Sequence, residues 1–148
     1  MNKTKPLNYI IIIVIFVLLL GITILKYHSK KVENETLWQA EATDKFDKNA
    51  IINSGYPSLI DIGRSDCYSC STMYNTLISL NKSNQNNIII KIVNFAKYHD
   101  LTTQFDFKVI PTQFFYDKDG SLYLKHEGSM SKEEIILTFK EMGYELYE

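Results

Sequence analysis

The chain has 148 residues, of which 45% are hydrophobic and 22% are charged, and its net charge is −1. This length accommodates one domain of ordinary size, and the composition is typical of a globular chain rather than a disordered one. Two cysteines are too few for a disulfide-stapled scaffold or for a four-thiolate zinc site. The balanced charge gives no indication of nucleic acid binding.

The N-terminal segment differs in character from the rest of the chain. Residues 1–31 contain five lysines and no acidic residue, whereas residues 32–148 carry a net charge of −6. From Tyr9 to Leu25 every residue is apolar or uncharged, and a helix of that length would span roughly 26 Å, close to a ~30 Å hydrocarbon core. We therefore predict a short basic tail over residues 1–8, a transmembrane anchor over 9–27, a polar juxtamembrane linker over 28–36 and a folded domain over 37–148.

A cleaved secretory signal and a buried helix of a soluble domain are the alternatives to an anchor. A secretory signal usually has a shorter apolar region that ends in small residues, whereas this run ends in GITILKYHSK and has no lipidation cysteine. A buried helix would need a domain able to surround an all-apolar cylinder. Both flanks are basic, so the lysine bias says little about orientation. A short N-terminal tail usually stays in the cytoplasm, which predicts a single-pass protein of the cell membrane with its folded domain outside the cytoplasm.

The folded domain is predicted to alternate helices and strands. Leu37–Ala42 is compatible with a short strand or with the beginning of a helix, and Asp44–Asn53 has apolar residues at helical spacing. The elements predicted after these are a buried strand over 58–63, a helix from the cysteines to Leu80, a polar turn over 81–87, a buried strand over 88–95, a short helix over 100–107, a hairpin around Asp119-Gly120, and a helix from the Ser131/Glu134 capping box to Gly143. This order predicts an α/β fold in which helices flank a mixed sheet.

The two cysteines form a C-x-x-C motif that directly follows a predicted strand and begins a predicted helix. At a helix N-terminus the unpaired amides and the helix dipole stabilise an anion, and the thiolate is the nucleophilic form of cysteine. The spacing places Cys70 one turn after Cys67, near enough to close a small disulfide ring. We predict redox chemistry in which the more exposed Cys67 attacks and Cys70 resolves the mixed disulfide.

Three alternatives to redox chemistry remain open for this pair. A structural disulfide across four residues would close almost no loop and add little stability through chain entropy. A metal half-site would need further ligands, and the histidines at positions 28, 99 and 126 are not at ligand spacing. The third alternative is that both cysteines are buried thiols without a chemical role. We predict neither a metal site nor a cofactor.

Three stretches of the sequence together resemble the thioredoxin family, over about residues 46–143. Asp61 lies six residues before Cys67 within a predicted strand, as the buried acid of the family does. The C-x-x-C motif opens the following helix. Ile110-Pro111-Thr112 begins 40 residues after Cys70, where the family has its cis-proline loop. The resemblance implies a thioredoxin-like three-layer sandwich.

The resemblance also implies roles for individual residues. Pro111 would be cis and lie beside the sulfurs, leaving the backbone of Ile110 open to pair with an extended substrate, and Tyr68 would contribute to substrate contact. Asp61 would lie beneath the disulfide and exchange a proton with Cys70 through water, a role that suits a carboxyl whose pKa is raised by an apolar strand. The alternatives are a proline that begins a strand and a solvated acid at a strand end.

The sequence departs from the family pattern in three places. Asp66 replaces the aromatic residue before the nucleophile, and its charge should oppose a thiolate on Cys67, with Arg64 placed to offset it. Tyr68-Ser69 replaces the usual Gly-Pro between the cysteines. The usual lysine partner of the buried acid is absent, since its position reads Ile92 with Lys91 next to it.

The function predicted from these features is a membrane-tethered thiol–disulfide oxidoreductase. It would reduce disulfides in partner proteins outside the cytoplasm and be recharged by an integral membrane thiol electron donor. A disulfide-donating oxidase of the same fold is the first alternative, which is less favoured because the segment 81–87 is too short for the helical insertion that such oxidases often carry. A non-catalytic docking module is the second.

Overall fold

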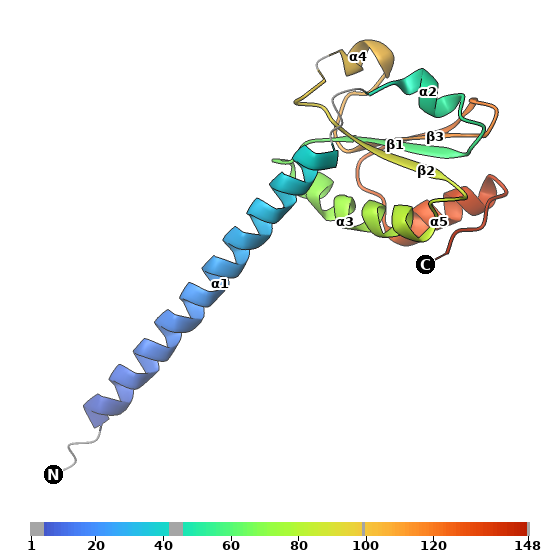
Figure 1. Cartoon of the computed structure of the whole chain (residues 1–148). Coiled ribbons are helices and arrows are strands. Elements are labelled where there is room, and N and C mark those ends of the chain that lie inside the picture. The colour runs from blue at the N-terminus through green and yellow to red at the C-terminus, as the bar shows by residue number, and fades with distance from the viewer. Residues whose placement is uncertain (1–4, 42–45, 99, 148) are drawn as a thin grey trace. The chain divides into compact units, whose positions relative to one another are not determined.

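The computed structural model describes residues 5–41, 46–98 and 100–147. The chain forms two compact units, Met1–Thr36 and Leu37–Glu148. The described part of the first unit belongs to helix α1, Lys5–Glu41, shown in blue in Figure 1. Within this helix Tyr9–Ser29 is long and apolar enough to cross a membrane, and none of its most apolar window is buried. A signal sequence near the N-terminus would have the same properties.

Helix α1 continues beyond the predicted anchor, residues 9–27, and ends at Glu41. The predicted linker, residues 28–36, lies inside α1, and residues 37–41 form the end of this helix and not a strand. No helix-breaking glycine or proline occurs between Lys26 and Glu41, so the apolar helix can continue through the polar segment. Ala42, Asp44 and the first four residues of the predicted basic tail lie outside the described residues.

The second unit is built on a four-stranded mixed sheet. Its strands are β1 (Ser58–Gly63), β2 (Ile89–Asn94), β3 (Thr112–Tyr116) and β4 (Leu122–Glu127), in the spatial order β2-β1-β3-β4. Strand β1 is parallel to β2, and β3 is antiparallel to both β1 and β4. Every residue of β1 and β3 is buried, as expected for strands covered on both faces of a sheet.

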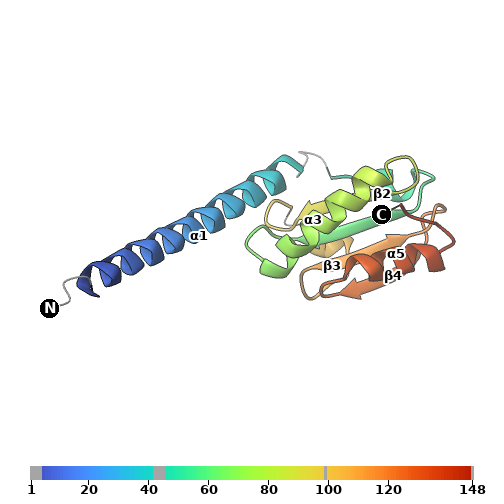
Figure 2. The ribbon, with the colours of Figure 1, turned by 90° about the horizontal axis from the view of Figure 1, so that it is seen from below.

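Helices cover both faces of this sheet (Figure 1). Helices α3 (Tyr68–Ser83) and α5 (Lys132–Glu141) lie across one face, as Figure 2 shows, and α2 (Lys48–Ile52) and α4 (Leu101–Gln104) lie on the other. The α3–α5 face is packed with Leu59, Leu77, Phe115, Ile135 and Phe139 among others. The opposite face has a separate cluster that includes Ile60, Ile62, Leu101, Phe105 and Phe114. This three-layer arrangement confirms the predicted fold class.

Helix ends and turns follow local sequence signals. Ser131 and Glu134 form the predicted capping box, with each side chain accepting a hydrogen bond from the backbone amide of the other. The predicted helix over Asp44–Asn53 is shorter, since Asp47 caps α2 by accepting a hydrogen bond from the amide of Ala50. Gly120, in the β3–β4 hairpin, has a φ of +83°, a backbone conformation that only glycine adopts without strain.

Candidate functional site

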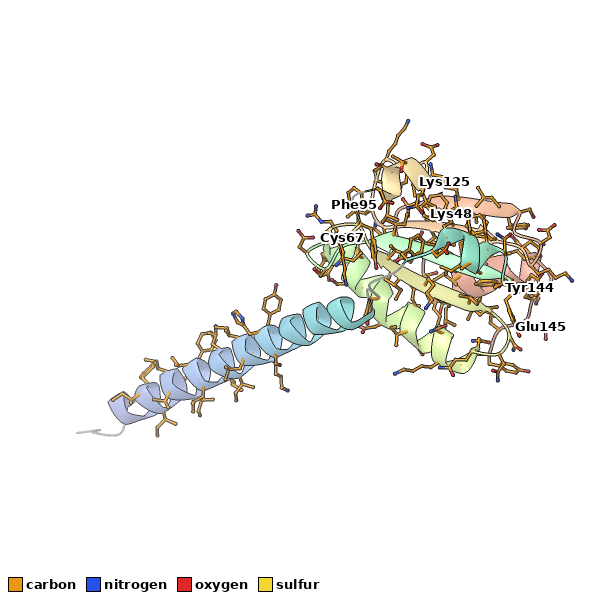
Figure 3. The ribbon with its side chains drawn as sticks, turned by 45° about the horizontal axis from the view of Figure 1, so that its top comes forward. Lys48, Cys67, Phe95, Lys125, Tyr144 and Glu145 are labelled. Atoms are coloured by element: carbon orange, nitrogen blue, oxygen red, sulfur yellow. A yellow bond between two sulfur atoms is a disulfide. The ribbon has the colours of Figure 1, made fainter. Side chains whose placement is uncertain are left out.

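The cysteine pair lies at the start of α3, just after the loop that connects this helix to β1. Strand β1 ends at Gly63, residues 64–66 form a short loop, and Cys67 is the N-cap residue of α3. Cys67 and Cys70 form a disulfide with their Cα atoms 5.3 Å apart. Figure 3 shows Cys67 at the same end of the domain as Phe95, which follows β2. The site therefore lies at the carboxyl ends of the two parallel strands.

The two sulfur-bearing residues differ in exposure, as predicted. Cys70 is fully buried in the α3–α5 core. Cys67 is partly exposed. The asymmetry arises from α3 itself, because its first turn directs Cys70 inward while the N-cap position stays at the surface.

Two hydrogen-bond donors surround the Cys67 sulfur. The backbone amide of Cys70 donates to Cys67 Sγ at 3.3 Å, and the Ser69 hydroxyl lies 3.3 Å from the same sulfur. When the disulfide is reduced, the same donors can stabilise a thiolate at the end of the helix.

The charge of Asp66 is compensated by its neighbour Arg64. The guanidinium donates two hydrogen bonds to the carboxylate, from Nε to Oδ1 at 2.8 Å and from Nη2 to Oδ2 at 2.5 Å. This hydrogen-bonded pairing lowers the pKa of Asp66 and raises that of Arg64. The pair is solvent-exposed, so its field at Cys67 is weakened by water and salt.

Asp61 is fully buried in the middle of β1. Asp61 is two residues after Leu59, so the two side chains share one face of β1 and Asp61 faces α3, the helix that carries Cys70. Burial raises the pKa of Asp61 to about 7, although a hydrogen bond from Gln113 opposes this shift. The Oδ2 oxygen has no hydrogen-bond partner among the described residues, so the alternative of a solvated strand-end acid does not hold.

Gln113 is the partner of Asp61, which was not predicted from the sequence. Strand register places Ile92 and Gln113 on either side of Asp61, and Lys91 is exposed on the opposite face of the sheet. Gln113 Nε2 donates to Asp61 Oδ1 at 2.7 Å. The available signal was an amide side chain at the start of the strand TQFFY, two residues after Pro111.

The peptide bond between Ile110 and Pro111 is cis. The loop is held by two hydrogen bonds, from Thr112 Oγ1 to the Val109 carbonyl at 2.6 Å and from the Gly128 amide to the Pro111 carbonyl at 2.9 Å. Ile110 is half-buried and packs, like Cys67, against the α3–α5 core. Within the described part of the chain, the Ile110 backbone makes no hydrogen bond to another residue.

Tyr68 does not pack against the other site residues. Its side chain is 90% exposed, at the first position of α3 between the two cysteines. Among residues 5–41, 46–98 and 100–147, no group of three or more histidine, cysteine, aspartate or glutamate residues is arranged to hold a metal ion. His99 lies outside the described residues.

Comparison with known proteins gives a family match and several structural neighbours. The family model described as a thioredoxin-like domain matches residues 45–143. No curated protein matches the sequence. Among solved structures, chloroplastic thioredoxin z is 16% identical with a TM-score of 0.59, and the match covers 65% of this chain and 86% of that one.

Two further structures show the same fold. The exposed lipoprotein thioredoxin of Streptococcus pneumoniae is 20% identical with a TM-score of 0.54, and the match covers 60% of this chain and 87% of that one. A malarial protein is 17% identical with a TM-score of 0.55, covering 59% of this chain and 97% of that one.

Proposed function

The chain belongs to the thioredoxin-like family, and we propose that it is a membrane-tethered reductase of disulfides in proteins outside the cytoplasm. Its fold and its C-x-x-C disulfide make it a thiol–disulfide oxidoreductase. The observation that carries the proposal is the asymmetric pair at the start of α3, with Cys67 at the surface and Cys70 buried beside the core. Disulfide-containing proteins are the corresponding class of substrate.

In the first step, reduced Cys67 attacks the substrate disulfide as a thiolate. A bond forms between Cys67 Sγ and one substrate sulfur, and the other substrate sulfur leaves as a thiolate that takes a proton from water. The Cys70 amide and the Ser69 hydroxyl support the attacking thiolate through their contacts with Cys67 Sγ.

In the second step, Cys70 resolves the mixed disulfide. Its thiol gives a proton to the Asp61 carboxylate, and the Cys70 thiolate attacks Cys67 Sγ. The Cys67–Cys70 disulfide forms, and the second substrate sulfur leaves as a thiolate. The substrate has gained two electrons and the enzyme has lost them. A buried carboxyl with a pKa of about 7 suits this exchange, since both of its protonation states are populated near neutral pH.

The substrate chain is proposed to bind along the cis-proline loop. The unpaired backbone of Ile110 offers a donor and an acceptor for an extended peptide, in the manner of strand addition to a sheet edge. Pro111 holds this backbone in place through its cis bond, and the exposed ring of Tyr68 supplies an apolar contact beside Cys67.

The connection between α3 and β2 supports reduction over oxidation. Helix α3 ends at Ser83 and β2 begins at Ile89, so this connection carries no inserted helical domain. A reductase outside the cytoplasm needs electrons from the cytoplasmic side, which we assign to an integral membrane thiol carrier. The apolar stretch Tyr9–Ser29 would tether the domain next to such a donor.

The test is the reduction potential of the Cys67–Cys70 pair, measured on the full chain in detergent with glutathione and dithiothreitol buffers. A value near about −270 mV supports the reductase, and a value near about −120 mV identifies a disulfide donor. If no reversible couple appears, the chain is a non-catalytic docking module and not an oxidoreductase. Cys67→Ser is the control, since it must abolish the couple without loss of the folded domain.

A further inference from the structure

We propose that Gln113 is the positioning residue for Asp61: its side-chain amide holds one carboxylate oxygen and leaves the other free to exchange a proton with Cys70. The role of Asp61 in this inference rests on the function proposed above. The role of Gln113 rests on the geometry of three neighbouring elements, β1, β3 and α3.

Strand register places Gln113 directly opposite Asp61. The two residues pair across β1 and β3, so their side chains emerge on the same face of the sheet. Gln113 Nε2 donates to Asp61 Oδ1 at 2.7 Å, the length of a strong hydrogen bond to a charged acceptor. Asp61 Oδ2, which is also buried, is left without a partner. Oδ1 is thus held by a hydrogen bond, and Oδ2 remains able to accept or donate a proton.

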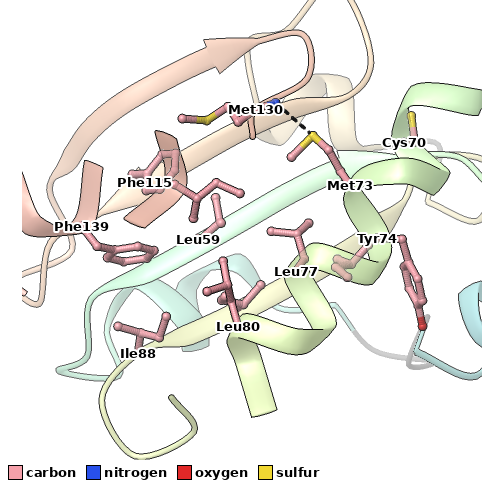
Figure 4. Packing of buried hydrophobic residues seen from close by; sticks show 13 residues of the cluster. Leu59, Cys70, Met73, Tyr74, Leu77, Leu80, Ile88, Phe115, Met130 and Phe139 are labelled. Atoms are coloured by element: carbon pink, nitrogen blue, oxygen red, sulfur yellow. Dashed lines mark hydrogen bonds between the residues drawn. The ribbon is translucent and has the colours of Figure 1, made fainter. Parts of the chain in front are cut away.

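Gln113 is itself held by α3. Its Nε2 lies 3.4 Å from Met73 Sδ, and Met73 follows Cys70 by three residues along the same helix. The Met130 amide also donates to this sulfur, at 3.3 Å, and Figure 4 shows this bond beside Cys70 and the buried apolar residues. A chain of contacts therefore runs from the helix of the resolving cysteine through Met73 and Gln113 to the acid.

Gln113 links the buried acid to the cis-proline loop. It lies two residues after Pro111, so the segment proposed to bind substrate also carries the partner of the acid. Leu59, Ile90, Ile92 and Phe115, which lie on this face of β1, β2 and β3, are apolar. A buried amide among them costs free energy unless it is hydrogen-bonded. The bond to Asp61 compensates the Nε2 end of Gln113, whereas Oε1 has no hydrogen-bond partner among the described residues.

A donor to the ionised carboxylate favours the ionised form. Burial raises the pKa of Asp61 to about 7, and the Gln113 bond keeps it from rising further. Without the donor, Asp61 would be mostly protonated at neutral pH, so fewer molecules could accept the proton of Cys70. Gln113 would then set the pH range in which the mixed disulfide is resolved.

Among the described residues, the core on this side of the sheet contains few other ionisable groups. Helix α3 contributes Tyr74 and the two cysteines, which do not titrate while they form the disulfide, and β2 contributes none, since Lys91 lies on its exposed side. On β4, His126 is in register with Gln113. The pKa of Glu134 on α5 is lowered mainly by its hydrogen bonds with Ser131, and the charge of His126 lowers it further. His126 is therefore the ionisable neighbour of Gln113 on β4, and the test includes a variant that removes it.

The experiment follows the Asp61 carboxyl by carbon-13 NMR in the oxidised full chain, labelled at aspartate and held in detergent micelles, from about pH 5 to about pH 10. Asp61→Asn assigns the signal by its loss. We expect a midpoint near 7 in the wild type and an upward shift of about one pH unit in Gln113→Met, which keeps the side-chain length and removes the donor. Gln113→Leu is a second variant without a donor.

Two control variants must leave the midpoint in place. His126→Gln removes the imidazole that lies in register with Gln113 on β4. Ser58→Ala removes a different buried polar group from the same strand as Asp61. An unchanged midpoint in both Gln113 variants overturns the inference, as does an equal shift in Ser58→Ala.

A kinetic measurement separates this inference from the proposed function. Reduced enzyme reacts with an aromatic disulfide reagent that releases one coloured thiolate when Cys67 attacks and a second when Cys70 resolves. In Gln113→Met the second release should be about fivefold slower at pH 7 and nearly normal at high pH, with the first release unchanged. A shifted NMR midpoint with normal second release supports positioning by Gln113 and overturns the proton-exchange role of Asp61.

Discussion

The sulfur of Cys67 caps the helix that carries its partner, because the backbone amide of Cys70 donates to Cys67 Sγ. In a reduced enzyme this amide and the Ser69 hydroxyl are the donors nearest to the nucleophile. The nucleophile is thus placed by the backbone of α3, and side-chain substitutions can adjust its reactivity without moving it.

Substitution of Ser69 by alanine removes one of these two donors. We expect the thiolate fraction of Cys67 at pH 7 to fall, and alkylation by iodoacetamide to slow by about two- to fivefold, since a single hydrogen bond of this partly buried kind contributes about 0.5–1 kcal/mol. The alkylation rate of the reduced full chain as a function of pH measures this effect. Thr72→Ala is the control, because Thr72 bonds only to the Tyr68 carbonyl on the outer face of α3. An alkylation rate in Ser69→Ala equal to that of the wild type would show that the amide alone stabilises the thiolate.

The ion pair of Arg64 and Asp66 should shield Cys67 from the adjacent negative charge. Arg64→Gln leaves the Asp66 carboxylate uncompensated, so alkylation of Cys67 should slow by about twofold at low ionic strength, and the difference should shrink as salt screens the charge. The double variant Arg64→Gln, Asp66→Asn should restore the rate. A loss in the single variant that persists at high salt and in the double variant would point to a structural role for Arg64.

Asp61 should make the folded domain less stable as pH rises. Its pKa is raised from 3.8 to about 7 in the folded state, so the folded state binds more protons than the unfolded state between these two pH values. The contribution of Asp61 is fully present below about pH 4 and lost as pH rises through about 7, and it amounts to a free energy on the order of 4 kcal/mol. Denaturant unfolding of Asp61→Asn and wild type at pH 5 and pH 8 should capture about 2–3 kcal/mol of it, and Asp61→Asn should be the more stable at pH 8. Parallel pH dependences for the two proteins would contradict a buried titrating carboxyl.

The order of elements could be predicted from the sequence because each carries a local signal. The apolar run of β1, the capping box of α5 and the glycine turn of the hairpin depend on residues a few positions apart. The cysteine pair belongs to the same class, since its position at the start of α3 follows from the strand before it and the apolar stripe after it. The cis bond before Pro111 was implied by the family resemblance alone.

The partner of the buried acid could not be predicted, because it depends on strand register. Gln113 is 52 residues from Asp61, and a one-residue slip of β3 would turn its side chain to the opposite face of the sheet. The absence of the family's lysine was visible, but what replaces it was not. The length of α1 was missed for a different reason, since a polar segment after an apolar run carries no signal that distinguishes a helix from an irregular linker.

Two glycines with similar backbone angles should respond differently to substitution. Gly55 and Gly120 have φ values of +80° and +83°, so alanine is strained at both by about 1 kcal/mol. An added Cβ at Gly120 would also lie 2.9 Å from the Ile52 carbonyl oxygen, whereas at Gly55 it would meet nothing within 4 Å. We expect Gly120→Ala to lower the free energy of unfolding by about 1–2 kcal/mol more than Gly55→Ala. Equal losses in denaturant unfolding would show that α2 moves away from the hairpin at little cost.

The location of the redox site can be tested with the cysteines themselves. The chain has only two cysteines, so a membrane-impermeant maleimide applied to intact cells with an impermeant reductant reports on this pair alone. We expect Cys67 to be labelled without permeabilisation and the full-length chain to stay in the membrane after carbonate extraction, because Tyr9–Ser29, the proposed anchor, is long and apolar enough to cross the membrane. Cys67→Ser should lose the rapid labelling. Labelling that requires permeabilisation would reverse the proposed orientation, and a shortened chain in the soluble fraction would identify the apolar helix as a cleaved signal.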